Sequence, residues 1–204
     1  MGYSIACCIL EAMPVRTLRA PKNEYDLFEA LKAGGVPVAP FATSVAAIGA
    51  VGIPAMIVVR HANKSVVRTM VAKYCDVAPA VAKAAKAKEF FMQKHITGHE
   101  VACGVLVSGR KILPLVPVDA IPRSLHESGA WHIKPAVQDA VQALAKAAHK
   151  AVGAKGNSCV RFVVDGATPY VTGIDCSPAL THTAPFMRSA LLAGFTLHEI
   201  YETI

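Results

Sequence analysis

The chain has 204 residues, of which 53% are hydrophobic and 17% charged, and its formal net charge is +7 at pH 7. This length is enough for a full hydrophobic core, and the high apolar fraction excludes a disordered chain. No window reaches the roughly 18 uncharged apolar residues of a membrane span, so we expect a soluble protein. The positive charge is compatible with binding to a nucleotide, to RNA or to an anionic surface, and it does not distinguish among them.

The six cysteines form no CxxC pair and show no zinc-ligand spacing. This pattern favours reduced thiols in an intracellular compartment, either cytoplasmic or mitochondrial. The apolar run 5–10 has no basic residue before it, so we interpret it as a buried element rather than a signal peptide. The basic stretch 16–22 leaves organellar targeting open.

The first half of the chain alternates between helical and extended patterns. A helix is expected over 22–35 because apolar residues recur on one stripe and a Gly pair follows as a C-cap. Two prolines make 36–41 extended. The continuously apolar run 55–60 predicts a strand buried on both faces, with 65–71 as its partner. Residues 76–88 have helical composition with Asp at the N-cap, and their lysines are interpreted as a solvated face.

The second half predicts a mixed sheet with a crossover helix between its strands. One hairpin turns at Ser108–Arg110 and another at Asp165–Gly166. The expected strands are 90–94, 101–107, 111–118, 159–164 and 169–174, and the expected helices are 135–152, 184–192 and 196–204. This order of elements predicts an α/β (α+β) fold of two lobes with a cleft between them.

Two segments carry the most specific information. Glu89–Glu100 is a strand that runs into a Gly turn bearing an acid, and Thr168–Leu180 is a strand that ends in a polar loop containing Pro178. Ligand chemistry in such folds concentrates at strand ends and loops. In this order the two segments resemble the ATP-grasp superfamily, in particular the central and C-terminal lobes of the D-alanine–D-alanine ligase family.

The resemblance implies an ATP-grasp fold and a domain division. We expect 1–21 to be a remnant of an N-terminal domain or an extension, 22–94 the central lobe and 95–204 the C-terminal lobe. The connection 123–134 is short where the family carries a loop that closes over ATP. The activity that the resemblance implies is the joining of a carboxylate to an amine through an acyl-phosphate, with ATP and magnesium as cofactors.

The resemblance also implies nucleotide-binding roles for four residues. Arg60 stands where the family has a phosphate-contacting Lys; the alternative is a surface cation at a strand end. Gln93 and Lys94 fall where the family strand joining the lobes meets adenine. Glu100 falls on the acid that accepts hydrogen bonds from the ribose hydroxyls, and its alternative is an exposed acid at a strand start.

For the metal site, the resemblance implies two carboxylates and an amide oxygen that hold two magnesium ions. The second acid falls at Gly173 and the amide at Asp175, which is therefore our candidate metal ligand. The first acid falls at Arg161, with Cys159 in place of a family Arg, or at Val163 if the register shifts by one residue. Because an unpaired cation repels magnesium, we expect a salt bridge between Asp175 and Arg161 instead of a dimetal centre.

Two other groups of polar residues could suggest a zinc site or a hydrolase triad, and we expect neither. His95 and His99 are four residues apart but span a strand and a Gly turn, so zinc coordination is not expected. Ser177, His182 and Asp175 lack the turn that exposes a nucleophile, so a hydrolase triad is not expected either.

Three functional hypotheses follow. The first is a catalytically degenerate relative that acts as a structural or interaction subunit, with a protein partner or as a homo-oligomer, and retains ATP binding. The second is an active ATP- and magnesium-dependent carboxylate–amine ligase, so the enzymatic status stays open. The third is a basic module that binds RNA or a large assembly.

Overall fold

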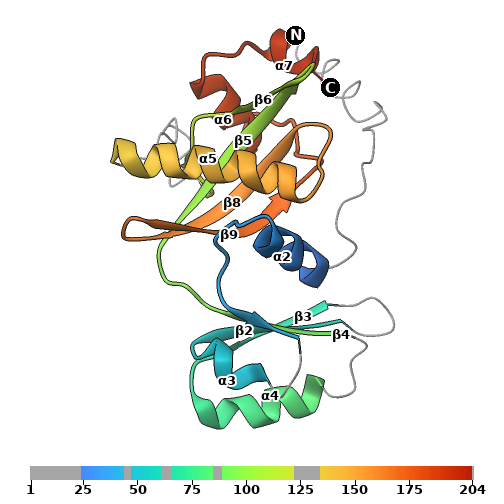
Figure 1. Cartoon of the computed structure of the whole chain (residues 1–204), viewed down its shortest axis with the longest axis vertical. Coiled ribbons are helices and arrows are strands. Elements are labelled where there is room, and N and C mark those ends of the chain that lie inside the picture. Colours follow the sequence, from blue (N-terminus) through green and yellow to red (C-terminus); the bar gives the residue numbers. More distant parts are fainter. Residues whose placement is uncertain (1–23, 44–46, 61–65, 85–88, 122–133, 204) are drawn as a thin grey trace, which may run out of the picture.

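The structure, a computed structural model, describes residues 24–43, 47–60, 66–84, 89–121 and 134–203. It contains two antiparallel sheets, one toward each end of the molecule (Figure 1). The predictions for 1–21, for the basic stretch 16–22 and for nearly all of the connection 123–134 lie outside the described residues.

The elements follow the predicted order. The strands are β1 (Phe41–Ala42), β2 (Ala55–Arg60), β3 (Val66–Val71), β4 (Glu89–Lys94), β5 (His99–Ser108), β6 (Lys111–Pro114), β7 (Val118–Asp119), β8 (Ser158–Asp165) and β9 (Thr168–Asp175). The helices are α2 (Glu24–Ala33), α3 (Ile48–Val51), α4 (Val77–Ala84), α5 (Pro135–Ala151), α6 (Pro185–Leu192) and α7 (Leu197–Tyr201), with a 3-10 turn at Tyr74–Asp76. The named strands pair antiparallel, and the expected mixed sheet is wrong to this extent: among the described residues, parallel pairing is limited to one bridge, between Val38 and Val171.

The four-stranded sheet has the order β1-β4-β2-β3, and with α3 and α4 it forms what we call the small lobe. Ile57 and Val59 of β2 pack with Met92 and Val71 in a core beneath these helices. Met56 and Val58, on the other face of β2, are half-buried and line a cavity. The prediction that 55–60 is buried on both faces is therefore wrong for one face, because that face borders the cavity.

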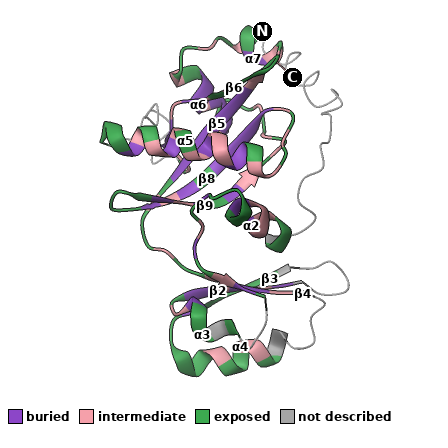
Figure 2. Ribbon diagram, viewed as in Figure 1, coloured by how far each residue is buried: buried purple, intermediate pink, exposed green. Residues whose placement is uncertain are grey.

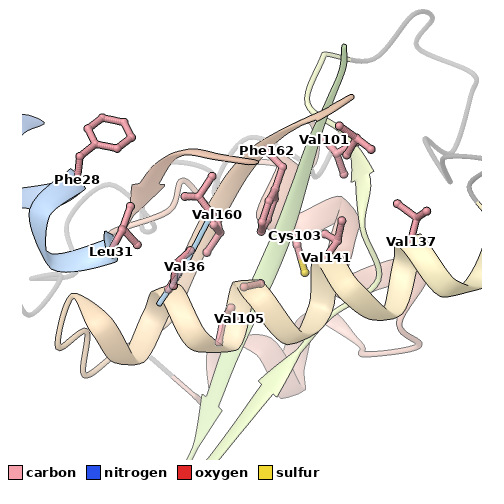
Figure 3. Packing of buried hydrophobic residues seen from close by; sticks show 14 of the residues in the cluster. Phe28, Leu31, Val36, Val101, Cys103, Val105, Val137, Val141, Val160 and Phe162 are labelled. Carbon is pink, nitrogen blue, oxygen red and sulfur yellow. The ribbon is translucent and has the colours of Figure 1, made fainter. Parts of the chain in front are cut away.

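The five-stranded sheet has the order β6-β5-β8-β9, with β7 paired to β5, and we call it the large lobe together with α2, α5, α6 and α7. Both of its faces are covered. Val101, Cys103 and Val105 of β5 pack in one core with α2 and α5, as Figure 3 shows, whereas Ala102 and Leu106 pack in a second core with α6 and α7. This explains the continuously apolar sequence of β5 and the buried centre of the sheet in Figure 2.

Two helices of the large lobe show the start and stop signals that the sequence predicts, whereas α7 ends at Tyr201, before the predicted residue 204. In α5, Pro135 occupies the first turn and Val137 and Val141 face the sheet. In α2, Phe28 and Leu31 join the same core, and the helix ends where Val36 N donates to the Leu31 carbonyl at 2.9 Å. α2 therefore packs in the large lobe, although the strand that follows it belongs to the small lobe.

The chain crosses between the lobes at two described segments, 36–41 and 94–99 (Figure 1). The crossings touch, because Lys94 N donates to the Pro40 carbonyl at 2.8 Å. Within the described ranges, no helix combines the length and apolar character that a membrane crossing requires.

Candidate functional site

A cavity of about 830 Å³ lies between the two lobes. Its wall combines β2, β3 and β4 of the small lobe, the crossing 94–98, and α2, β8 and β9 of the large lobe. The described residues that line it are Leu27, Phe28, Ala39, Met56, Val58, Arg68, Phe91, Gln93, Lys94, His95, Ile96, Thr97, Gly98, Glu100, Ala120, Arg161, Phe162, Val163, Thr172, Gly173 and Ile174. This volume is typical of small-molecule sites, which range from about 300 to 1,000 Å³.

One part of the wall is aromatic and aliphatic. The rings of Phe28 and Phe91 stack with centroids 5.3 Å apart at an interplanar angle of 15°. Met56 and Val58 continue this surface along β2. An apolar wall of this kind suits a flat ring system, which gains from burial and from stacking geometry.

The polar part of the wall is predominantly cationic. Its described charged groups are the side chains of Arg68, Lys94 and Arg161 against the single carboxylate of Glu100. Lys94 is the last residue of β4 and Glu100 the second residue of β5, so the two side chains lie at opposite ends of the crossing between these strands. A cleft lined by one sign of charge concentrates ligands of the opposite sign.

Gln93 brings an unsatisfied donor to this wall. Its Nε2 is buried and has no hydrogen-bond partner among the described residues. Such a group costs about 1–3 kcal/mol when it is left unpaired, so it favours a ligand that offers an acceptor. Gln93 is held in place by its backbone, which pairs with Phe41 on one side and Met56 on the other.

The crossing 94–98 is fixed by its backbone. Lys94 N donates to Pro40 O at 2.8 Å and His95 N donates to Pro54 O at 2.9 Å, so neither N–H group is available to a ligand. Gly98 lies so close to the end of β8 that a Cβ built on it would be 2.4 Å from the Val164 carbonyl oxygen. Only glycine fits there without a backbone shift.

The structure brings together three of the four residues that the sequence assigned to nucleotide binding. Gln93, Lys94 and Glu100 all line the cavity. Arg60 ends β2, where its backbone pairs with Glu89 and Val66, and its side chain lies outside the described part of the structure. Glu100 fits both of its interpretations, since it is exposed at a strand start and also faces the cavity.

Asp175, the candidate metal ligand, is not part of the described cavity wall. Its Oδ1 accepts a hydrogen bond from Ser177 N at 2.9 Å, which shapes the loop after β9. The expected salt bridge to Arg161 does not form: both residues are described, and no ion pair or hydrogen bond joins them. The strand register explains this, because Arg161 lies opposite Gly173 and Asp175 lies opposite Cys159.

The described residues do not fit a divalent metal centre. Across the described ranges, no group of three or more His, Cys, Asp and Glu side chains could hold a metal ion. Magnesium prefers oxygen ligands that include one or two carboxylates, and the described wall offers Glu100 as its single carboxylate, with Lys94 and Arg161 in the same cavity.

Some polar contacts near the cavity could not be foreseen from the sequence. Arg188 on α6 donates from Nη2 to the Asp119 carbonyl at 2.5 Å, while its Nε and Nη1 are buried without a partner among the described groups. Burial lowers the pKa of Arg188 from its ordinary value. His99 Nε2 lies 2.6 Å from Asp119 Oδ1. Asp119 is 20 residues from His99 and 69 from Arg188 in the sequence, so no local sequence pattern predicts these two contacts.

The described cysteines are free thiols, and two of them are inert by burial. Burial raises the pKa of Cys159 to about 12 and raises that of Cys103 further. Cys103 also donates to the Leu115 carbonyl at 3.2 Å. The protein therefore places no activated thiol at these positions.

Two antiparallel sheets lie on either side of one cavity and are joined by two touching crossings, and this arrangement is the ATP-grasp fold. Solved structures show the same fold. The D-alanine–D-alanine ligase of Bacillus anthracis complexed with ATP has a TM-score of 0.69 at 17% identity, with 91% of this chain and 65% of that chain covered. The ligase of Coxiella burnetii has a TM-score of 0.74 at 19% identity, with 90% and 55% covered.

The particular proteins that this chain resembles are D-alanine–D-alanine ligases, as the sequence predicted. The ligase of Anaeromyxobacter sp. is 26% identical over 211 residues, covering 93% of this chain and 62% of the relative. The ligase of Leptospira interrogans is 30% identical over 129 residues, covering 55% and 37%. The chain thus spans 37 to 62% of the length of these curated relatives. No protein-family model matches it.

Proposed function

We propose that the cavity between the lobes binds ATP. The observation that carries this proposal is the convergence of Gln93, Lys94 and Glu100 on one cavity that also has an aromatic wall. The resemblance to nucleotide-binding proteins assigned these residues to nucleotide binding, and all three line this cavity. The resemblance to a ligase solved with ATP supports the same interpretation.

In this proposal each part of the wall meets a different part of the nucleotide. The adenine ring lies against Phe91 and Met56, and the buried Nε2 of Gln93 donates to a ring nitrogen. Glu100 accepts from the ribose hydroxyls, and Lys94 lies beside Gln93 at the adenine end, where its positive charge adds to the attraction of the cavity for the phosphates. The side chain of Arg60 remains a predicted phosphate contact.

We further propose that the chain is a catalytically inactive relative of the ligases that acts as a structural or interaction subunit. The support is chemical: Asp175 shapes a loop through Ser177 and the described wall has one carboxylate, so the metal site of the family has no equivalent set of oxygens among the described residues. An active magnesium-dependent ligase is the alternative, with metal ligands supplied elsewhere in the chain or by another chain.

The division into 1–21, 22–94 and 95–204 remains part of this proposal as a division of the sequence, although α2 packs against the lobe that 95–204 forms. An intracellular location and a protein partner or second copy are also part of it. Val67 and Met70 support a partner, because they are 47% and 44% exposed on β3, which is an edge strand. RNA binding is a lesser alternative, supported by the net charge of +7 alone.

A ligand titration tests ATP binding. ATP at a hundred times its dissociation constant should add about 2.7 kcal/mol of stability, which raises the melting temperature by about 5–10 °C in a protein of this size. Glu100→Gln and Gln93→Leu should reduce the shift, whereas Asp139→Asn, on an exposed site of α5 outside the cavity, should preserve it. An unchanged melting temperature with ATP, ADP and adenosine would overturn the proposal.

A turnover assay separates the inactive protein from the active alternative. ATP, magnesium and D-alanine or another amino acid are supplied, and ADP release is followed. We expect no release above the level of a blank reaction. Sustained release that Glu100→Gln abolishes would replace the proposed role with that of a working ligase.

A further inference from the structure

We infer that the cavity holds the phosphate groups of its nucleotide through Arg161, without a divalent metal ion. This inference rests on the proposed ATP binding and adds how the triphosphate is held. It starts from the disagreement between the magnesium that the fold family implies and the side chains that are present.

The position of Arg161 is set by the pairing of β8 with β9. Arg161 lies directly opposite Gly173, next to a bulge between Arg161 and Phe162. A Cβ built on Gly173 would be 3.8 Å from both Nε and Nη2 of Arg161. The guanidinium therefore lies over the Gly173 backbone, in the direction that a side chain at this position would take.

Arg161 is available to a ligand. Its side chain is exposed and lines the cavity, and it makes no hydrogen bond or ion pair with any other described residue. A planar guanidinium offers paired N–H donors that match two phosphate oxygens at once. Gly173 adds no carboxylate that would neutralise it.

The rest of the described wall strengthens this preference for a free anion. Lys94 adds positive charge to the same cavity, and Glu100 is the single acid among the described lining residues. The cations Lys94 and Arg161 repel a divalent metal ion and attract the four negative charges of ATP that magnesium would otherwise partly neutralise. Metal-free ATP is therefore the better electrostatic match to this cavity.

A purely structural Arg161 is the competing explanation. In that case the residue covers the surface of the β8–β9 pair with its aliphatic stem, and its removal changes stability rather than phosphate affinity. The two explanations differ in whether an Arg161 variant discriminates between ATP and adenosine, which lacks phosphates.

Isothermal titration calorimetry on the full chain tests the inference, with ATP and adenosine as ligands in excess EDTA and in millimolar magnesium. We expect ATP to bind in EDTA at least as tightly as in magnesium. Arg161→Gln should weaken ATP binding in EDTA by about tenfold or more, because it removes charge-assisted hydrogen bonds to the phosphates, and should leave adenosine unchanged.

Arg110→Gln is the matched control, because Arg110 is an exposed arginine in the turn between β5 and β6 and does not line the cavity. A second variant, Gly173→Glu, has space for its Cβ and places a carboxylate beside Arg161, so it should weaken metal-free ATP binding. Circular dichroism confirms that each variant is folded.

The outcomes separate the two proposals. ATP binding that requires magnesium, or an Arg161→Gln variant that binds ATP normally in EDTA, would overturn the metal-free site and leave nucleotide binding intact. Absence of binding for both ATP and adenosine in either buffer would overturn the proposed function and this inference with it.

Discussion

The substitution Gly98→Ala should destabilise the protein and disturb the cavity together. The new Cβ would lie 2.4 Å from the Val164 carbonyl oxygen and 2.8 Å from Val163 Cγ1. The first contact is with backbone in a sheet and cannot be relieved by a side-chain rotation, so the crossing segment must move by several tenths of an ångström. Overpacking of this kind costs about 1–3 kcal/mol.

The expected loss can be measured by urea denaturation and by melting temperature. For a protein of 150–250 residues, about 1–3 kcal/mol corresponds to a fall of about 2–12 °C. ATP affinity should fall as well, because Gly98 belongs to the cavity wall and lies two residues from Glu100. The loss of affinity should exceed that of any surface variant of equal stability.

Gly49→Ala is the matched control for this substitution. Gly49 lies in α3, and a Cβ added there would have nothing within 4 Å, so the same chemical change should be neutral or stabilise by up to about 1 kcal/mol. A Gly98→Ala protein as stable as the wild type, with unchanged ATP affinity, would refute the role of this close contact.

Four further outcomes are expected. Burial lowers the pKa of His149, so at acid pH the unfolded chain binds a proton at this residue more readily than the folded protein does. The contribution of His149 to the free energy of unfolding should be complete above the ordinary pKa of about 6.5 and should fall as the pH drops below it. His149→Gln should flatten this pH dependence in acid titrations of unfolding. Thr196→Ala removes the N-cap of α7 and should cost about 1 kcal/mol in chemical denaturation, whereas an unchanged midpoint would show that the cap is dispensable. Asp175→Asn should leave the calorimetric affinity for ATP unchanged, because the carboxylate lies outside the described cavity wall; a large loss would return this residue to the site. Cys75 is exposed and should react with a thiol reagent in the native protein, whereas Cys159, with its raised pKa, should react only after unfolding, as mass mapping of the labelled peptides would verify.

Sequence patterns predicted the elements well because most of them carry a local signature. Each of these signatures determines the backbone only a few residues away. Examples are the Gly pair after α2, Pro135 at the start of α5 and the Asp165–Gly166 turn. The single-sided burial of β2 was missed because a cavity wall and a core can both be apolar. Only the tertiary structure shows that Met56 faces open space while Ile57 faces α3 and α4.

The site was predictable where one short segment carries it and unpredictable where distant segments meet. Gln93, Lys94 and Glu100 stand within eight residues, and a strand followed by a Gly turn presents them together. The placement of Arg161 over Gly173 depends on a strand register with a bulge. The sequence does not reveal this register, and we therefore expected Arg161 to form a salt bridge with Asp175 instead. The contribution of Arg68 required the position of β3 in the sheet.

The two touching crossings have a practical consequence for dissecting this protein. A fragment that begins at residue 95 would keep the larger sheet but lose Leu31 and Val36, which fill one of its cores. The smaller sheet, expressed alone from residue 41 to 94, would lose the wall that Phe28 contributes beside Phe91. Truncations that follow the linear order of the sequence would therefore damage both halves, and single substitutions in the intact chain are the sounder way to assign their roles.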